Sequence, residues 1–138
     1  MTKSYNIIID TNIWISIAFG GKIIEQVFKV VFNNNINIFV CPELLSEVRN
    51  TLKKPKIAKY ISEERATSTL LIIEASTQKV QLHNYSLKVC RDPKDDYLLA
   101  LGIQVNADYL ITGDKDLLEL NQVSNLKIIK LIDFVNSL

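Results

Sequence analysis

The chain has little excess charge, cysteine or histidine, and each shortage excludes a class of protein. Its 16 basic residues nearly balance 15 acidic ones, and the resulting net charge of +1 excludes a strong overall field that would attract nucleic acid. Any nucleic acid must therefore bind a local basic patch. Two isolated cysteines, Cys41 and Cys90, and a single histidine, His83, do not form the ligand pattern of a zinc site and indicate a reduced, intracellular protein.

Long hydrophobic runs are also absent. No run approaches the roughly 18 apolar residues of a membrane-spanning helix. The apolar run near the N-terminus, Ile7–Ile9, is too short for the hydrophobic region of a signal peptide. We therefore expect a cytoplasmic protein with no membrane association. The 138 residues, 48% of them hydrophobic, predict one domain over residues 1–138 with one core.

Strand-like and helix-like segments alternate along the chain. The segments predicted as strands are 5–9, 36–41, 80–82, 109–111 and 126–129. The segments predicted as helices are 14–19, 23–32, 42–52, 62–76, 95–105, 116–120 and 132–135, with a basic break at 53–59. The first strand ends in a continuous apolar run, Ile7–Ile9, which is typical of a strand buried on both faces. This order predicts an α/β fold with a central parallel sheet of about five strands, covered by helices on both faces.

Four short acidic segments are the most informative feature of the sequence: IIIDTN, PELLSEV, RDPKDDYLLA and YLITGDKD. Two predicted strands run into Asp10 and Asp114, and functional crevices lie at the carboxyl ends of parallel strands. Glu47 and Asp95 lie on predicted helices. Two carboxylates about 4 Å apart repel by roughly 4 kcal/mol at an effective dielectric of ~20, so a cluster of them favours a bound divalent cation.

Helical spacing ranks the acids that lie on helices. Glu47 lies about 115° from the centre of its helix's apolar stripe, near the buried boundary, and the alternative is a solvated glutamate. Asp95 lies at the middle of an apolar face, as either a capping group or a ligand, and the ligand interpretation is favoured. Asp96 lies at the flank of that face, as a first-turn charge or a supporting group. Asp116 is either a further ligand or the N-cap of its own short helix.

The chemistry that suits these acids is metal-assisted hydrolysis of a phosphodiester. Mg²⁺ and Mn²⁺ prefer oxygen ligands and keep water molecules that serve as nucleophile, so no protein nucleophile is required. Asn12 is a candidate cap for the helix after Asp10, and Thr112 places a hydroxyl beside Asp114. Covalent catalysis by Cys41 or Cys90 with His83 is disfavoured because none of them lies in a recognisable motif.

In order and spacing these segments resemble the PIN-domain nucleases, and closely the VapC-like subgroup, the toxins of bacterial toxin–antitoxin pairs. The matching pieces are IIIDTN, the glutamate of LLSEV, RDPKDDYLLALG and YLITGDKDLL, which span Tyr5 to Leu118. The resemblance implies a three-layer α/β/α sandwich and a Mg²⁺- or Mn²⁺-dependent ribonuclease. It also implies a homodimer and a partner antitoxin protein. The acidic site that it implies consists of Asp10, Glu47, Asp95 and Asp114, with Asp116 as a further member and Asn12 and Thr112 in support.

The residues predicted to bind the RNA substrate are basic residues in two parts of the chain. Arg91 and Lys94 lie close in sequence to Asp95 and are the better candidates to meet a scissile phosphate. Lys53 and Lys54 open a basic stretch that ends at Tyr60, which suits RNA phosphates and a stacked base but equally suits a solvated helix end. Trp14 is interpreted as a core or dimer contact.

Two other functions compete with an RNA nuclease. The first is an aspartate-based phosphatase or phosphoacceptor domain that uses Asp10. A haloacid-dehalogenase-like phosphatase would need a second aspartate two positions later, where this chain has Asn12. The second is a non-catalytic domain that binds RNA or protein and whose acids merely bind metal.

Overall fold

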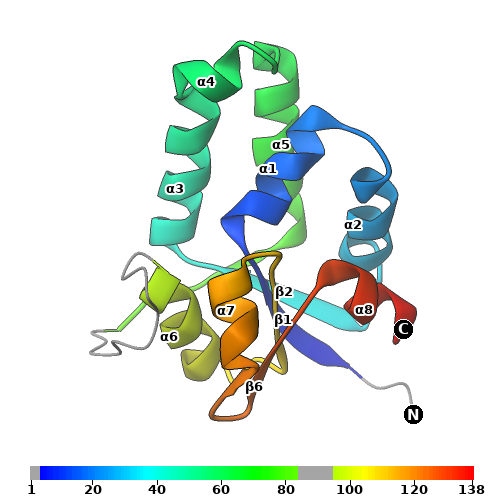
Figure 1. Cartoon of the computed structure of the whole chain (residues 1–138), viewed down its shortest axis with the longest axis vertical. Coiled ribbons are helices and arrows are strands. Elements are labelled where there is room, and N and C mark those ends of the chain that lie inside the picture. Colours follow the sequence, from blue (N-terminus) through cyan, green and yellow to red (C-terminus); the bar gives the residue numbers. More distant parts are fainter. Residues whose placement is uncertain (1–3, 84–94) are drawn as a thin grey trace.

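The computed structural model describes residues 4–83 and 95–138, which form an α/β fold around a mostly parallel sheet (Figure 1). The strands are β1 Tyr5–Ile9, β2 Ile36–Val40, β3 Gln78–Lys79, β4 Tyr109–Ile111, β5 Gln122–Val123 and β6 Leu126–Ile129. The helices are α1 Thr11–Phe19, α2 Ile23–Val31, α3 Pro42–Lys53, α4 Pro55–Ala58, α5 Glu63–Ser76, α6 Asp96–Gln104, α7 Lys115–Leu120 and α8 Leu131–Asn136. No helix in the described ranges is long and apolar enough to cross a membrane.

The strand order places a switch in chain direction beside β1. The order across the sheet is β3-β2-β1-β4-β6-β5, so the chain first moves outward from β1 to β2 and β3 and then returns to β4 on the other side of β1. Ile9 pairs with Ile111 in parallel register, so the residues that follow, Asp10 and Thr112, leave neighbouring strands at the same edge of the sheet. Ligands bind at such switch points in open α/β sheets.

The predicted α/β fold is confirmed, and most predicted strands appear within a residue of their expected bounds. Ile7, Ile8 and Ile9 are fully buried, as their uninterrupted apolar run predicts. Two details differ. The third strand lies at Gln78–Lys79 rather than 80–82, and the short strand β5, which was not predicted, pairs antiparallel with β6.

The helices differ from prediction mainly at their starts. Helix α1 begins at Thr11, directly after Asp10, rather than at Trp14, and Trp14 is fully buried in the core. The basic break holds the short helix α4, whose Pro55 suits a first helical turn. Ser62 caps α5 as expected, because its side chain accepts a hydrogen bond from the Arg65 N–H at 3.2 Å.

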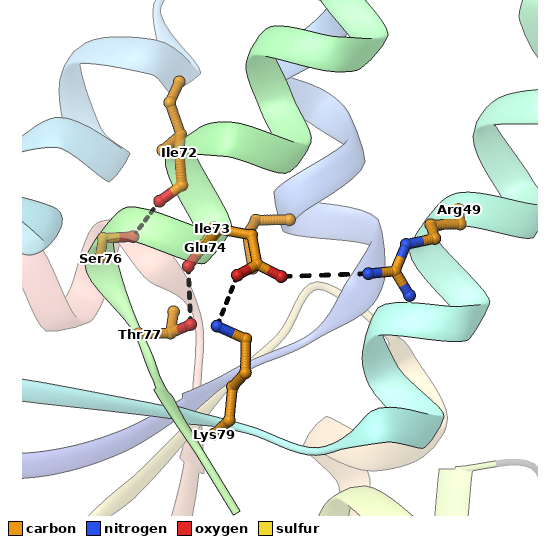
Figure 2. A network of polar contacts seen from close by, with 7 residues as sticks. All are labelled: Arg49, Ile72, Ile73, Glu74, Ser76, Thr77 and Lys79. Atoms are coloured by element: carbon orange, nitrogen blue, oxygen red, sulfur yellow. Dashed lines mark hydrogen bonds and ion pairs between the residues drawn. The ribbon is translucent and has the colours of Figure 1, made fainter.

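Helix α5 is tied to the edge of the sheet by a charged network. Figure 2 shows Glu74 between Lys79 of β3 and Arg49 of α3, with its carboxylate 2.5 Å from the lysine Nζ and 4.0 Å from the arginine guanidinium. All three side chains are partly exposed, so these ion pairs contribute little stability. Lys79 also places a charge on an edge strand, which discourages pairing with other chains.

Helix α6 runs antiparallel to β1, so its first turn lies at the carboxyl edge of the sheet. At its start, the Tyr97 hydroxyl lies 3.3 Å from Oγ1 of Thr11, just beyond β1. Beyond its end, the Asp108 N–H donates to the carbonyl of Asn6 at the beginning of β1, at 2.7 Å. The helix also contacts β4 and β6. The switch point therefore receives the amino end of α6.

Gly102 allows α6 to pack closely on β6, and its replacement by alanine is expected to destabilise the protein. An added Cβ would lie 2.6 Å from Cδ2 of the buried Leu126. Overpacking of a core costs about 1–3 kcal/mol, which outweighs the gain in helix propensity of about 1 kcal/mol. Urea denaturation should show a net loss of about 1 kcal/mol. In a Leu126→Ala background the alanine should cost less, and equal costs in both backgrounds would contradict this steric account.

Candidate active site

Asp10 and Thr112 form the centre of the polar edge. The Thr112 hydroxyl donates to Oδ2 of Asp10 at 2.6 Å, and both residues are buried, with Asp10 only 4% exposed. The backbone N–H of Asn12 lies near the Asp10 carboxylate and lowers its pKa, although the Asp10 side chain makes no capping hydrogen bond to α1. Because the Asp10 N–H continues the sheet by bonding the Ile111 carbonyl at 2.9 Å, backbone and side chain both hold this aspartate in place.

The loop after β4 extends this arrangement to Asp114. Oγ1 of Thr112 accepts the Asp114 N–H at 3.0 Å, so one hydroxyl joins two predicted site residues. Oδ1 of Asp114 accepts the Asp116 N–H at 2.8 Å, which makes Asp114 the N-cap of α7. The interpretation of Asp116 as that N-cap is therefore wrong. Asp116 lies half-buried in the first turn, and its role as a ligand stays a prediction.

Glu47 reaches the site from α3 through a tyrosine. The Tyr97 hydroxyl donates to Oε2 of Glu47 at 2.6 Å, and the Thr11 hydroxyl lies 3.3 Å from the same tyrosine oxygen. Since the tyrosine proton is directed at Glu47, the threonine hydroxyl is the donor to the tyrosine oxygen. Elements α1, α3 and α6 therefore meet at one phenol group.

The structure reverses the expected order of the two adjacent aspartates at the start of α6. Helix α6 begins at Asp96, which is 4% exposed, whereas Asp95 is the half-buried N-cap before it. The ligand role that helical spacing gave to Asp95 therefore stays a prediction. Every residue from 96 to 102 is buried, so this stretch has no exposed face from which a helical count could find its centre.

The cluster of acids changes the proton affinity of Asp10. Burial is the main cause that raises the pKa of Asp10, and the negative charges of Glu47 and Asp114 raise it further. The hydrogen bond from Thr112 and the nearby Asn12 backbone N–H lower it and only partly compensate. Burial and the bond to Glu47 likewise raise the pKa of Tyr97, so its phenol stays protonated at neutral pH. Within residues 4–83 and 95–138, no lysine or arginine forms an ion pair with Asp10, Glu47 or Asp114.

The roles predicted for Asn12 and Thr112 can be compared with their contacts in the structure. Asn12 lies inside α1 with an exposed side chain, so it does not cap that helix; Asp10 occupies the N-cap position. The Asn12 backbone N–H lowers the pKa of Asp10, and a supporting role for Asn12 stays a prediction. The predicted support by Thr112 is the pair of hydrogen bonds already described.

The basic residues predicted to bind substrate are only partly placed. Arg91 and Lys94 lie outside the described residues. Lys53 and Lys54 are exposed at the far end of α3 from the sheet. Lys53 and Arg49 line the same cavity of about 600 Å³ between α3 and α5 and so lie on the same side of α3. Glu47 lies about 160° from Arg49 around the helix, on the other side. Lys53 therefore faces away from the acids, and its contact with RNA stays a prediction.

Two residues at the site were missed by sequence reasoning, Thr11 and Tyr97. The sequence signal for Tyr97 was its position, since it is a phenol directly after Asp96 in an otherwise apolar helix. A buried tyrosine hydroxyl usually finds a hydrogen-bond partner, so such a residue beside an acidic motif points to a polar contact there.

The oxygen donors suit a hard divalent ion, although they are not arranged as a complete cage. In the described part of the chain, no three acidic, histidine or cysteine side chains converge closely enough to enclose a metal. Mg²⁺ usually binds proteins through one or two carboxylates and keeps several waters, so a full cage is not needed. Thr112 contacts the carboxylate of Asp10 and the backbone N–H of Asp114, and the charge of Asp114 raises the pKa of Asp10, so these two acids are the candidates for such a pair.

Comparison with known proteins agrees with this geometry. A family model described as "PIN domain" matches residues 6–116, a span that contains all the acids discussed here. The uncharacterised protein MJ1680 of Methanocaldococcus jannaschii is 30% identical over 115 residues, which cover 83% of this chain and 74% of that protein.

Two solved structures share the fold. VapBC2 from Rickettsia felis, bound to a DNA fragment from its promoter, aligns with a TM-score of 0.60 and 15% identity over 89% of this chain and 96% of that chain. The PIN domain endonuclease Utp24 aligns with a TM-score of 0.56 and 16% identity over 90% of this chain and 83% of that chain. At these identities the likeness concerns the fold alone.

Proposed function

This chain belongs to the PIN-domain family, and on that premise we propose that it is an endoribonuclease that hydrolyses RNA phosphodiester bonds with Mg²⁺ or Mn²⁺. The observation that carries the proposal is the burial of Asp10 at the switch point. The charges of Glu47 and Asp114 raise its pKa, and no cationic side chain among the described residues pairs with it. A buried carboxylate beside two further negative charges is stabilised when a proton or a metal ion neutralises it.

Each acid has a role in this proposal. Asp10 and Asp114 would hold the metal ion, with an aspartate at the start of α6 and Asp116 as further ligands. The sequence pattern assigns the α6 role to Asp95, and burial favours Asp96. When bound, the ion supplies a Lewis acid that activates water and neutralises charge on the phosphate.

The remaining steps belong to side chains of this chain. Thr112 fixes the orientation of Asp10 by its hydrogen bond to Oδ2. Glu47 accepts the proton of the attacking water through Oε1, which has no hydrogen-bond partner among the described residues. The amino end of α6 directs its positive dipole toward this edge, which favours the negative phosphate. Arg91 and Lys94 are proposed to contact that phosphate, and Lys53 and Lys54 a more distant part of the RNA.

A cleavage assay on single-stranded RNA tests the proposed function. We expect cleavage with Mg²⁺ or Mn²⁺ and none with EDTA. Because water is the nucleophile, a substrate with 2′-O-methyl groups should still be cut, and no 2′,3′-cyclic phosphate should form. Cleavage in EDTA or a cyclic product would contradict the mechanism. Stabilisation by metal without turnover on any RNA would favour a non-catalytic domain.

We also propose that the chain is the toxin of a toxin–antitoxin pair, acts as a homodimer and is inhibited by an antitoxin protein. The shared fold with VapBC2 supports this role, although it does not identify a partner. Expression of the chain should arrest growth, and a small protein encoded beside its gene should relieve the arrest. Normal growth at high expression of a nuclease-active protein would speak against it.

A further inference from the structure

The contact between Tyr97 and Glu47 differs from the other contacts at the site because it is the only hydrogen bond that the described residues give to the carboxylate of a candidate proton acceptor. Glu47 is half-buried on α3, and the one hydrogen bond of its side chain within the described residues is the 2.6 Å bond from the Tyr97 hydroxyl to Oε2. It forms no ion pair there. A glutamate with three rotatable side-chain bonds would otherwise sample several rotamers.

We propose that Tyr97 is a positioning residue that holds Glu47 in one rotamer and leaves its Oε1 atom directed at the reacting water. This inference rests on the proposed nuclease function and adds a residue to it. Hydrogen bonds to carboxylates are short and strong, and a donor that occupies one oxygen also determines where the other points.

The surroundings of Tyr97 make its ring a fixed reference point. Its side chain is 6% exposed, and it lies in the first turn of a helix whose next five residues are all buried. Its oxygen also receives the Thr11 hydroxyl from the first turn of α1. Thr11 directly follows Asp10 in the chain. The contacts of the Tyr97 hydroxyl with Thr11 and Glu47 therefore connect Glu47 to the end of β1, where Asp10 lies.

Replacing Tyr97 by phenylalanine removes the hydroxyl and keeps the ring. We expect kcat for RNA cleavage to fall about 10-fold with KM within about 2-fold, as is typical when a residue that orients a catalytic group is lost. In a Glu47→Gln background the same change should have almost no further effect. A crystal structure of the Tyr97→Phe variant should show Glu47 in more than one rotamer.

Two control variants separate positioning from general loss of packing. Tyr109→Phe makes the same chemical change at the start of β4, at the opposite edge of the sheet, and should leave kcat unchanged. Thr11→Val removes the longer contact to the tyrosine oxygen but keeps the bond to Glu47, so kcat should change by no more than about 3-fold.

The outcomes distinguish this inference from the proposed function. A Tyr97→Phe variant with wild-type kcat, or one whose loss adds fully to that of Glu47→Gln, would overturn the inference and leave the nuclease intact. If the wild-type protein cleaves no RNA, the proposed function fails. The crystal structure then decides the inference alone, and a single wild-type rotamer of Glu47 in the variant overturns it.

Discussion

Replacing Asp10 by asparagine is expected to slow RNA cleavage by about 10³-fold, because a bound divalent ion contributes several kcal/mol of charge stabilisation and Asp10 is its central proposed ligand. The substitution preserves shape, since the asparagine oxygen still accepts the Thr112 hydroxyl. The loss should therefore reflect charge rather than a collapsed site. Initial rates at saturating Mn²⁺ measure it, and an Asp10→Asn variant with the wild-type rate would contradict the assignment.

The same variant should be more stable than the wild-type protein at neutral pH in EDTA. The pKa of Asp10 is raised above its ordinary value of 3.8, mainly by burial, so the folded protein binds this proton more tightly than the unfolded chain. Stability is therefore lost as the pH rises from 3.8 through the raised pKa. Asparagine carries no charge and avoids that loss, so at pH 7 the free energy of unfolding should rise by on the order of 1 kcal/mol.

Two further measurements test this account of Asp10. Below pH 3.8 the advantage of the variant should disappear, because Asp10 is then neutral in both folded and unfolded chains. Added Mn²⁺ should raise the melting temperature of the wild-type protein and have little effect on the variant. Asp133→Asn, on an exposed residue of α8, is the matched control and should change neither cleavage nor metal response. A destabilised Asp10→Asn variant would contradict the electrostatic argument.

The sequence was sufficient to predict the sheet and the position of its active edge. The apolar run Ile7–Ile9 was predicted as part of a buried strand and the segment Tyr109–Ile111 as a further strand, and an acid lies within three residues after each. The prediction that Asp10 and Asp114 share an edge did not require knowledge of strand order, because carboxyl ends of parallel strands lie together. The 2.6 Å bond that joins Asp10 to Thr112 is consistent with it.

The features that were missed depend on contacts between distant segments. Strand β5 has only Gln122 and Val123, and a strand of that length exists through its antiparallel pairing with β6 rather than through local preference. The role of Tyr97 depends on α1 and α3 meeting at its hydroxyl, which no local pattern reveals. Helical periodicity needs one exposed face, and the beginning of α6 has none.

A pair of matched variants can decide whether Asp95 or Asp96 contributes more to RNA cleavage. We expect Asp96→Asn to slow RNA cleavage by about 10²-fold or more, on the scale of losing a ligand or a group that orients one. Asp95→Asn should slow it by less than about 5-fold, because Asp95 is half-buried and makes no side-chain capping bond, so it acts on the helix terminus through its charge alone. Both variants remove one charge from the same turn, so a general change in the field near α6 would affect them equally.

The difference between the two variants follows from burial. Asp96 precedes Tyr97, whose hydroxyl contacts Thr11 and Glu47, so the first turn of α6 lies against the acidic edge. A 4% exposed aspartate in that turn lies inside the acidic edge rather than in solvent, and carboxylate oxygens in such a position suit a hard divalent cation. Rates for both variants should be measured with melting temperatures, so that unfolding is not mistaken for lost chemistry. If Asp95→Asn lowers the cleavage rate more than Asp96→Asn does, Asp95 is the ligand, as helical spacing predicts, and burial is the wrong criterion.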